Sequence, residues 1–189
     1  MAARCVVVRH GETEWSLSGR HTGLTDVPLI EAGRARAAEV ATELAGREFA
    51  LVLTSPLRRA RETCELAGFG AVAEICEDLH EWDYGEYEGL TTPEIRERAP
   101  DWYLWRDGCP GGETPAKVGE RADRVRARLD ETEGEALLFA HGHILRVLAA
   151  RWIELGVQDG ARFTLAAGFT GTLGYERAIE AIERWNARA

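Results

Sequence analysis

The sequence has 189 residues, of which 45% are hydrophobic and 29% are charged. These proportions are ordinary for a globular protein that buries a full hydrophobic core, and we expect residues 1–189 to form a single domain. The formal net charge of −9 at pH 7 argues against nucleic acid or a membrane as a partner, because polyanions need a basic protein surface.

Apolar runs and helical stretches alternate along the chain, which indicates crossover connections between parallel strands. Strands are expected at residues 5–8, 50–54, 72–75 and 136–140. Helices are expected at residues 32–45, 56–67, 115–131 and 144–155. The glycine-spaced tail, residues 162–185, predicts two or three further short strands. The expected fold is therefore a three-layer α/β/α sandwich with a mostly parallel central sheet.

Three helix details follow from local sequence. Ser55-Pro56 is a favourable helix start, because serine caps free amides and proline suits the first turn. Residues 118–129 are so rich in Arg, Glu and Asp that their apolar stripe is thin, which predicts a solvated outer helix. Gly156 should end the helix over residues 144–155.

The cysteines and the amino terminus indicate a cytoplasmic protein. Cys5, Cys64, Cys76 and Cys109 include no CxxC pair and have no close histidine at zinc-finger spacing. Reduced thiols are therefore expected rather than disulfides or structural zinc. No hydrophobic run approaches membrane-spanning length, and the first residues lack the apolar core of a signal peptide.

Two predicted strands end in histidines. Arg9-His10-Gly11 follows the first strand, and His141-Gly142-His143 follows the strand at residues 136–140. Ligands of parallel sheets bind outside the carboxyl ends of the strands, so His10 and His141 should face one crevice. Arg9 would supply a fixed positive charge there, and the amino terminus of the second helix would offer amides to the same anion.

The histidines also fit two simpler roles. One histidine alone could be a core residue bonded to a carbonyl, although the second His-Gly pair weakens that interpretation. His141 and His143 could also form a metal pair, because alternate residues of a strand point the same way. Gly142 should end the strand, however, and no further set of ligands is evident. We therefore predict no metal site.

Two further segments carry candidate chemistry. Arginines 58, 59 and 61 follow a third strand, at the same predicted edge of the sheet. Glu81 lies among bulky apolar residues, where desolvation raises the pKa of a carboxyl group and suits it to be a general acid. Asp83 competes for that role, and Glu81 could instead pair with an arginine.

Residues 79–112 form an aromatic-rich segment that we interpret as an ordered insertion beside the site. Trp102 and Trp105 are expected to form a local core, since aromatic clusters more often pack than bind ligands. For Trp82 and Tyr84, which flank Glu81, packing and a place in the pocket remain equal alternatives.

Five motifs in order resemble the histidine phosphatase superfamily, also called the phosphoglycerate mutase-like family, over essentially the whole chain. They are Val8 to Thr13, Gly19 to Leu29, Ser55 to Ala60, Glu81 with Gly85 and Glu88-Gly89, and His141-Gly142. An isolated RHG motif would be a weak signal, whereas five spaced motifs are specific.

The resemblance implies a role for each matching residue. His10 would be the nucleophile that accepts the phosphoryl group, and Glu81 would protonate the leaving oxygen and later activate water. Arg9, Arg59 and a cationic His141 would form the phosphate pocket. Ser16, Thr22, Gly23 and Gly142 would line the substrate site, and Trp82, because it is next to the acid, is our further candidate for it. The implied reaction needs no metal or cofactor, and its partner is a small phosphorylated metabolite such as a sugar phosphate.

The chain departs from the mutase branch at three places. Ser16 replaces the usual Asn, and Ile30 replaces a helix-capping Thr, which affects local stability but not the chemistry. The insertion after the acid is short, and this shortness favours hydrolysis over phosphate transfer. The resemblance is closest to acid phosphatases and sugar bisphosphatases. We therefore predict a metal-independent phosphomonoesterase, with a cofactor-dependent phosphoglycerate mutase as the first alternative. A noncatalytic phosphate-binding or scaffolding protein is the second alternative, and a metallohydrolase is the third. We also expect that the protein can form a homodimer.

Overall fold

The computed structural model describes residues 4–188, in which six strands form one sheet in the order β3-β2-β4-β1-β5-β6. The strands are β1 (Arg4–Arg9), β2 (Leu51–Thr54), β3 (Glu74–Ile75), β4 (Glu135–Ala140), β5 (Thr170–Glu176) and β6 (Ile179–Ala187). β1 to β4 run parallel, whereas β5 is antiparallel to β1 and β6 is antiparallel to β5. The mostly parallel sheet is confirmed. The tail does contain two strands, but β5 and β6, with 7 and 9 residues, are longer than the short strands predicted there.

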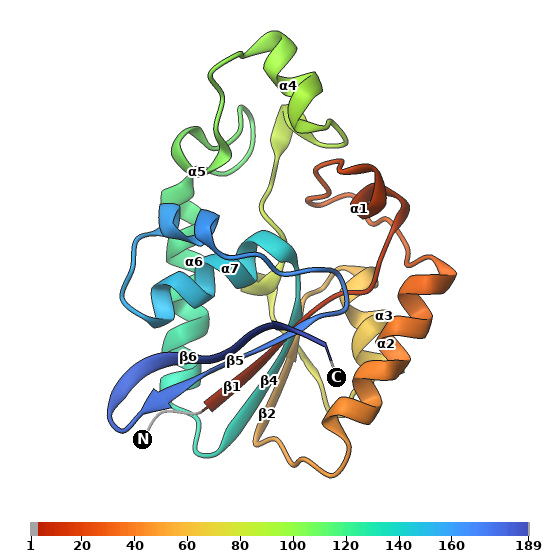
Figure 1. Ribbon diagram of the computed structural model, residues 1–189, viewed down its shortest axis with the longest axis vertical. Coiled ribbons are helices and arrows are strands. Elements are labelled where there is room, and N and C mark those ends of the chain that lie inside the picture. Colours follow the sequence, from red (N-terminus) through yellow and green to blue (C-terminus); the bar gives the residue numbers. More distant parts are fainter. Residues whose placement is uncertain (1–3, 189) are drawn as a thin grey trace.

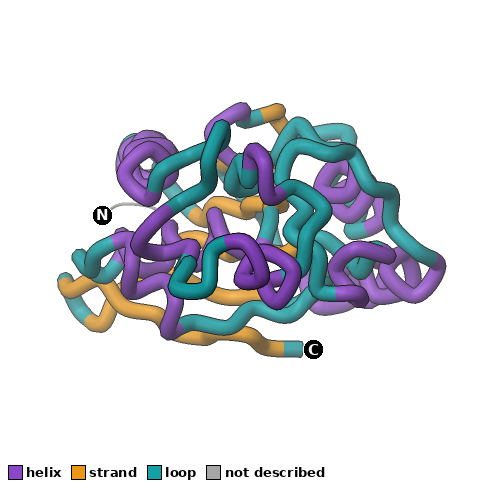
Figure 2. The backbone as a smooth tube through the Cα atoms, turned by 90° about the horizontal axis from the view of Figure 1, so that it is seen from above, coloured by secondary structure: helices purple, strands orange, loops and turns teal. Residues whose placement is uncertain are grey.

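Helices cover both faces of this sheet and complete three layers (Figure 1). The α-helices are α1 (Glu14–Ser18), α2 (Glu31–Leu44), α3 (Arg58–Leu66), α4 (Thr92–Arg98), α5 (Leu104–Asp107), α6 (Pro115–Asp130) and α7 (Gly142–Trp152). The 3-10 helices are η1 (Glu77–Leu79), η2 (Gly85–Tyr87) and η3 (Val157–Arg162). Seen from above, the strands run between helices, and β6 forms an outer edge (Figure 2). No helix within residues 4–188 is long and apolar enough to cross a membrane.

The central strands are buried on both sides, which explains their continuous apolar sequences. In β4, Leu137 and Phe139 join the cluster under α2 and α3, whereas Ala136 and Leu138 join the cluster under α6 and α7. Side chains of a strand alternate between faces, so one run of apolar residues supplies both layers of core.

The predicted solvated helix has a wider buried face than expected. Val118, Ala122, Val125 and Leu129 of α6 are buried, and so is Arg121. Arg121 donates to both carboxylate oxygens of Glu113 at 2.8 Å, so an arginine with the sequence context of a surface charge is part of the interior. Apart from Gly119, the remaining residues of α6 are exposed or half-buried, as expected for a solvated outer helix, and the buried charge of Arg121 was missed because composition does not show which charges are paired inside.

The start of α3 was also predicted wrongly. The helix begins at Arg58 rather than at Pro56, and its cap position is Leu57, whose side chain makes no capping bond. Asp26, from a distant loop, accepts a hydrogen bond from the Arg58 amide at 2.8 Å. The Ser55 hydroxyl accepts from the Leu57 amide at 3.3 Å, just before the helix, and it also bonds to the ring of His141.

Two more boundaries differ from the prediction. β3 is limited to Glu74–Ile75, because residues 72 and 73 belong to the turn after α3. α7 begins at Gly142, directly after β4, and ends at Trp152 rather than near Gly156. The early start of α7 brings its first amides to the carboxyl edge of the sheet.

The register of the two central strands places the histidines together. β1 pairs with β4 in parallel, and Arg9 lies opposite Ala140. His10 and His141 are the next residues of the two strands, so both leave the sheet at the same edge. Segment 79–112, drawn in yellow-green to green in Figure 1, passes beyond this edge and carries α4 and α5. Trp102 and Trp105 are buried in the main core, which confirms their packing role.

Candidate active site

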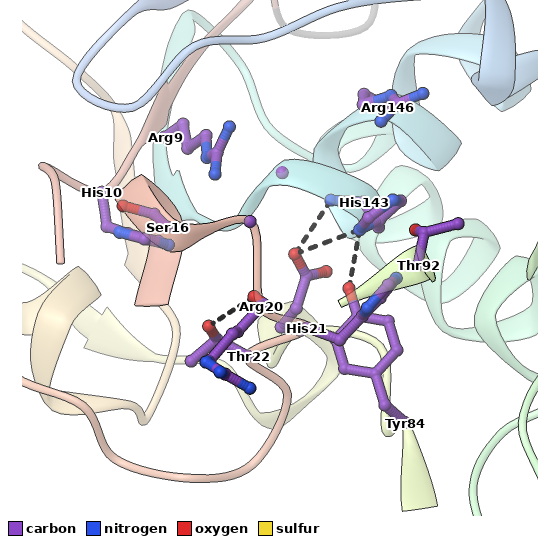
Figure 3. Close-up of a pocket in the computed structure, with 13 residues that line it drawn as sticks. Arg9, His10, Ser16, Arg20, His21, Thr22, Tyr84, Thr92, His143 and Arg146 are labelled. Atoms are coloured by element: carbon purple, nitrogen blue, oxygen red, sulfur yellow. Dashed lines mark hydrogen bonds and ion pairs between the residues drawn. The ribbon is translucent and has the colours of Figure 1, made fainter. Parts of the chain in front are cut away.

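A cavity of about 290 Å³ lies at the carboxyl ends of β1 and β4. Its lining residues come from both strand ends, the α1 region, segment 79–112 and α7: Arg9, His10, Ser16, Gly19, Arg20, His21, Thr22, Glu81, Tyr84, Thr92, Gly142, His143 and Arg146 (Figure 3). The fold thus brings His10, Arg9 and Glu81 to one cavity, although Glu81 is far from the other two in sequence.

His10 presents an unprotonated ring nitrogen. Its Nδ1 lies 2.7 Å from the Gly11 carbonyl oxygen, and because a carbonyl only accepts, Nδ1 carries the proton and Nε2 keeps a lone pair. Burial and the positive charges of Arg59 and Arg9 hold the pKa of His10 well below its usual value. The ring is therefore neutral at neutral pH, as a nucleophile must be.

Gly11 has no room for a side chain. A Cβ placed on Gly11 would lie 2.3 Å from the carbonyl oxygen of Gly33, at the start of α2. This close contact between the His10 loop and α2 explains why glycine follows the histidine, and it restricts the backbone that carries the imidazole.

His141 lies behind His10, with the ring centroids 5.1 Å apart. Arg59 Nε donates to His141 Nδ1 at 3.1 Å, so the proton of the neutral ring is on Nε2, which lies 2.7 Å from the Ser55 hydroxyl. Burial and the adjacent charge of Arg59 lower the pKa of His141 well below its usual value. The expectation of a cationic His141 was therefore wrong.

Arg59 is fully buried and does not line the cavity. Besides His141, its guanidinium donates to the carbonyl oxygens of Thr25 at 2.9 Å, Gly23 at 2.8 Å and Thr22 at 3.1 Å. In this conformation Arg59 lies one layer behind the expected phosphate position, where it fixes the loop over residues 22–25 and orients His141.

Arg9 lines the cavity directly. One of its terminal nitrogens donates to the Leu165 carbonyl at 2.6 Å, while its buried Nε has no hydrogen-bond partner within residues 4–188. A Cβ on Gly142 would lie 3.3 Å from the Arg9 guanidinium, so the glycine lets the helix start approach this cation. A buried donor without a partner is costly, which favours an anion beside it.

Glu81 is held as a carboxylate at the start of α7. Its Oε1 accepts from the amides of Trp82 at 2.9 Å and Ile144 at 3.0 Å, and its Oε2 accepts from the His143 amide at 2.9 Å. The position before α7, His141, provides no side-chain cap, so Glu81 caps this helix in its place.

These contacts overturn the expected direction of the Glu81 pKa. Burial by itself raises that pKa, but the interactions of the carboxylate with the side chain and the amide of His143 hold it well below its usual value. Sequence showed the apolar neighbours of Glu81 and could not show the amides of a helix that starts at Gly142. The loop is fixed from α6 as well, because Arg121 donates to the carbonyls of Asp78 and His80.

The predicted substrate-binding residues divide into two groups. Ser16, Thr22 and Gly142 line the cavity, whereas Gly23 and Trp82 do not. The Gly23 amide donates to Glu88 at 2.8 Å. The Trp82 side chain is fully buried, and its Nε1 donates to the Glu113 carbonyl at 3.1 Å, so its place is in the core.

Several lining residues were not predicted as part of the phosphate site. They are Arg20, His21, Thr92, His143 and Arg146, of which His143 had been considered only as a metal ligand. The spacing of Gly142 and Arg146, four residues apart on one helix, was a usable signal. The positions of Arg20 and His21 depend on a loop whose course is set by tertiary contacts, such as the bond from the His21 amide to the Leu90 carbonyl.

The rings of His141 and His143 have different partners. His141 Nε2 meets Ser55, whereas His143 Nδ1 lies 2.6 Å from the Tyr84 hydroxyl. Across the described part of the chain, no group of three or more His, Cys, Asp or Glu residues is placed to hold a metal ion.

Comparison with known proteins defines the class. The family model of the histidine phosphatase superfamily (branch 1) matches residues 5–188, and the chain belongs to that family. It is 44% identical over 184 residues to an acid phosphatase of Mycobacterium tuberculosis, covering 95% of this chain and 90% of the relative.

Two further relatives agree with this assignment. A sedoheptulose 1,7-bisphosphatase of Saccharomyces cerevisiae is 39% identical, with 84% of this chain and 70% of the relative covered. The solved structure of an open reading frame product from Mycobacterium tuberculosis superposes with a TM-score of 0.91 at 39% identity, over 97% of both chains.

Proposed function

We propose that this protein is a metal-independent phosphomonoesterase that hydrolyses small phosphorylated metabolites through a phosphohistidine at His10. One observation carries the proposal: a neutral His10 with its Nε2 lone pair available lies beside Arg9, whose buried Nε has no hydrogen-bond partner among the described residues. A nucleophile next to an unsatisfied cation suits attack on an anionic phosphorus centre.

The arrangement supports a two-step reaction. His10 Nε2 attacks phosphorus, and Arg9 with the amide of Gly142 stabilises charge on the phosphoryl oxygens. Arg59 and His141 contribute from the layer behind the phosphate position. Arg59 adds a positive charge there, and the hydrogen bond between the two buried side chains holds both in place. Water then attacks the phosphohistidine, which returns His10 to its neutral form.

The alcohol part of the substrate has space on the opposite side. A recess of about 210 Å³ adjoins the cavity and shares His21, Thr92 and His143 with it. Its remaining walls come from segment 79–112, chiefly aromatic residues with one arginine: Arg96, Trp102, Tyr103, Leu104 and Trp105. Together the two spaces suit a metabolite of sugar-phosphate size, and relatives named acid phosphatase and sedoheptulose bisphosphatase support that class.

The proposal includes a cytoplasmic location and no nucleic-acid partner. The net charge of −9 and the four buried cysteine thiols support both statements.

Phosphate release from a panel of phosphorylated metabolites tests the proposal, with radioactive phosphate trapped on His10 in rapidly quenched samples. Hydrolysis with label on His10 is expected. A cofactor-dependent mutase would instead isomerise 3-phosphoglycerate, and a phosphate-binding protein would bind ligand without turnover. Either of those results, or label on another residue, would contradict the assignment.

A further inference from the structure

A chain of three polar side chains borders the cavity on its leaving-group side. The Tyr84 hydroxyl lies 2.6 Å from His143 Nδ1, and the same nitrogen lies 3.8 Å from Glu81 Oε2 (Figure 3). Tyr84 and Glu81 are buried, and the side chain of His143 is 23% exposed. All three line the cavity, so the chain is open to a bound substrate.

The phosphatase reaction leaves a question about its proton. Three backbone amides donate to Glu81, and they favour its carboxylate over its protonated form. A carboxylate has no proton to give to a leaving oxygen. The His143 ring lies next to this carboxylate, and it can bind the missing proton.

We infer that the leaving-group proton is shared between Glu81 and His143, with Tyr84 as the residue that positions the His143 ring. The inference rests on the proposed function, since it concerns the proton of that reaction. When the pair holds the proton, the proton lies mainly on His143, and Glu81 is its anionic partner. When His143 is neutral, Tyr84 donates to its Nδ1; when His143 is protonated, Nδ1 donates instead.

The proton balance of both steps closes with His10, the Glu81–His143 pair, the substrate and water. His10 Nε2 bonds to phosphorus, the phosphorus–oxygen bond breaks with its electron pair on the leaving oxygen, and the Glu81–His143 pair gives its proton to that oxygen. In the second step water attacks phosphorus and its proton returns to the pair. The phosphorus–nitrogen bond then breaks with its electrons on His10.

The charges around His143 set the pH range of this exchange. Burial lowers the pKa of His143, and hydrogen bonding and attraction from Glu81 partly offset that effect. Arg146, on the next turn of α7, and His21, from the loop after α1, also face the ring, and their charges lower the same pKa. Activity therefore declines as the pair loses its proton with rising pH.

The sign of a mutational effect follows from the shared proton. Two groups that compete for one proton bind it at least as tightly as either group alone. Without His143, only the amide-bonded Glu81 remains, so the descending limb of kcat against pH must move to lower pH.

The test measures pH profiles of His143→Gln with an alkyl phosphate and with p-nitrophenyl phosphate. We expect the descending limb for the alkyl phosphate to move toward acid and its kcat at pH 7 to fall by about 10²-fold, the lower range for general-acid catalysis. p-Nitrophenyl phosphate should lose much less, because nitrophenolate leaves without a proton.

His80→Gln is the matched control. His80 precedes Glu81 and bonds to its backbone carbonyl at 2.7 Å, but its ring does not line the cavity. Its pH profile should match that of the unmodified protein. The inference would be overturned if the descending limb of the pH profile stayed at its original pH in His143→Gln and if kcat fell equally on both substrates.

Tyr84→Phe provides a second measurement with a smaller change of volume. Loss of the phenol removes the donor that stabilises neutral His143, so the limb should move to higher pH, opposite to His143→Gln. Tyr87→Phe is its control, because Tyr87 also lies in segment 79–112 and its ring packs edge-to-face against Trp102. If the descending limb of the pH profile does not move in Tyr84→Phe, Tyr84 does not influence the protonation of His143.

Failure of the inference can be told from failure of the proposed function. An unmodified protein that releases no phosphate and takes no label on His10 defeats both. If the unmodified protein is active and takes label on His10, but the pH profile of His143→Gln keeps its descending limb at the original pH, only the inference of a shared proton is contradicted.

Discussion

The two sides of the cavity are built differently. The phosphate side is made of residues at strand ends and helix starts, where Arg59 and His141 are fully buried and bonded to backbone or to each other. The leaving-group side comes from loops, α1, and segment 79–112, and it includes the half-buried His21 and the exposed Arg96. A rigid side suits the phosphoryl group common to all substrates, whereas a loop-built side can differ with the alcohol.

Removal of the proposed nucleophile should have the largest effect. His10→Ala eliminates the imidazole that lines the cavity next to Arg9, so turnover should fall by at least about 10⁴-fold on every substrate. Phosphate release and phosphohistidine trapping check this result. A variant that keeps substantial activity would show that the phosphate side does not contain the nucleophile.

Glu81→Gln should separate the two sides of the cavity. Glutamine keeps the size of the side chain but cannot carry the proton, so alkyl phosphates should lose about 10²–10⁴-fold in kcat and p-nitrophenyl phosphate much less. Asp83→Asn is the control, because the Asp83 side chain accepts from the Gly85 amide and does not line the cavity. Selective loss in Asp83→Asn instead would move the acid to that residue.

Arg9→Gln should weaken the phosphate side evenly. One electrostatic donor to a transition state is typically worth about 3 kcal/mol, so kcat should fall by about 100-fold on alkyl phosphates and on p-nitrophenyl phosphate alike. Steady-state kinetics on both substrates measure the ratio. A loss confined to substrates with poor leaving groups would place Arg9 on the other side.

Arg96→Ala should affect the leaving-group side alone. The Arg96 side chain borders the recess, and its Nε donates to the Trp102 carbonyl. For an exposed charge pair worth up to about 1 kcal/mol, KM should rise about fivefold for substrates that carry a second anionic group. Monophosphates without that group are the control, and their KM should stay constant. An equal rise for both kinds of substrate would contradict this placement.

Chelation should have no effect. In the proposed reaction, Arg9, Arg59 and the amide of Gly142 neutralise the phosphate charge that a divalent ion neutralises in metal-dependent phosphatases. Assays after treatment with EDTA should give unchanged kcat and KM. Activity lost on chelation and recovered with zinc or magnesium would instead support a metal site at His141 and His143.

Acid should harm the nucleophile only far below neutral pH. Burial and the charges of Arg59 and Arg9 lower the pKa of His10, so the neutral, attacking form persists as the pH falls below the usual histidine range. The ascending limb of kcat/KM against pH should therefore lie well below about pH 6.5, the ordinary histidine value.

The sheet and the phosphate side of the cavity could be predicted from sequence. Apolar runs buried on two faces predict parallel strands, and Arg9-His10-Gly11 and His141-Gly142 each follow such a run. The topology of the sheet determines the position of residues at the ends of its strands. That is why Arg9, His10 and Gly142 could be assigned to one cavity before any contact was known.

The leaving-group side and the charges of the site depend instead on tertiary contacts. The place of Trp82 in the core and of Tyr84 in the cavity depends on how segment 79–112 folds, and both are aromatic residues in one irregular stretch. The pKa of Glu81 falls rather than rises because the helix that starts at Gly142 brings the side chain of His143, and then its own first amides, to the carboxylate. Hydrogen bonds between segments distant in the chain have no local sequence pattern, so their effect on protonation emerges only when the chain is folded.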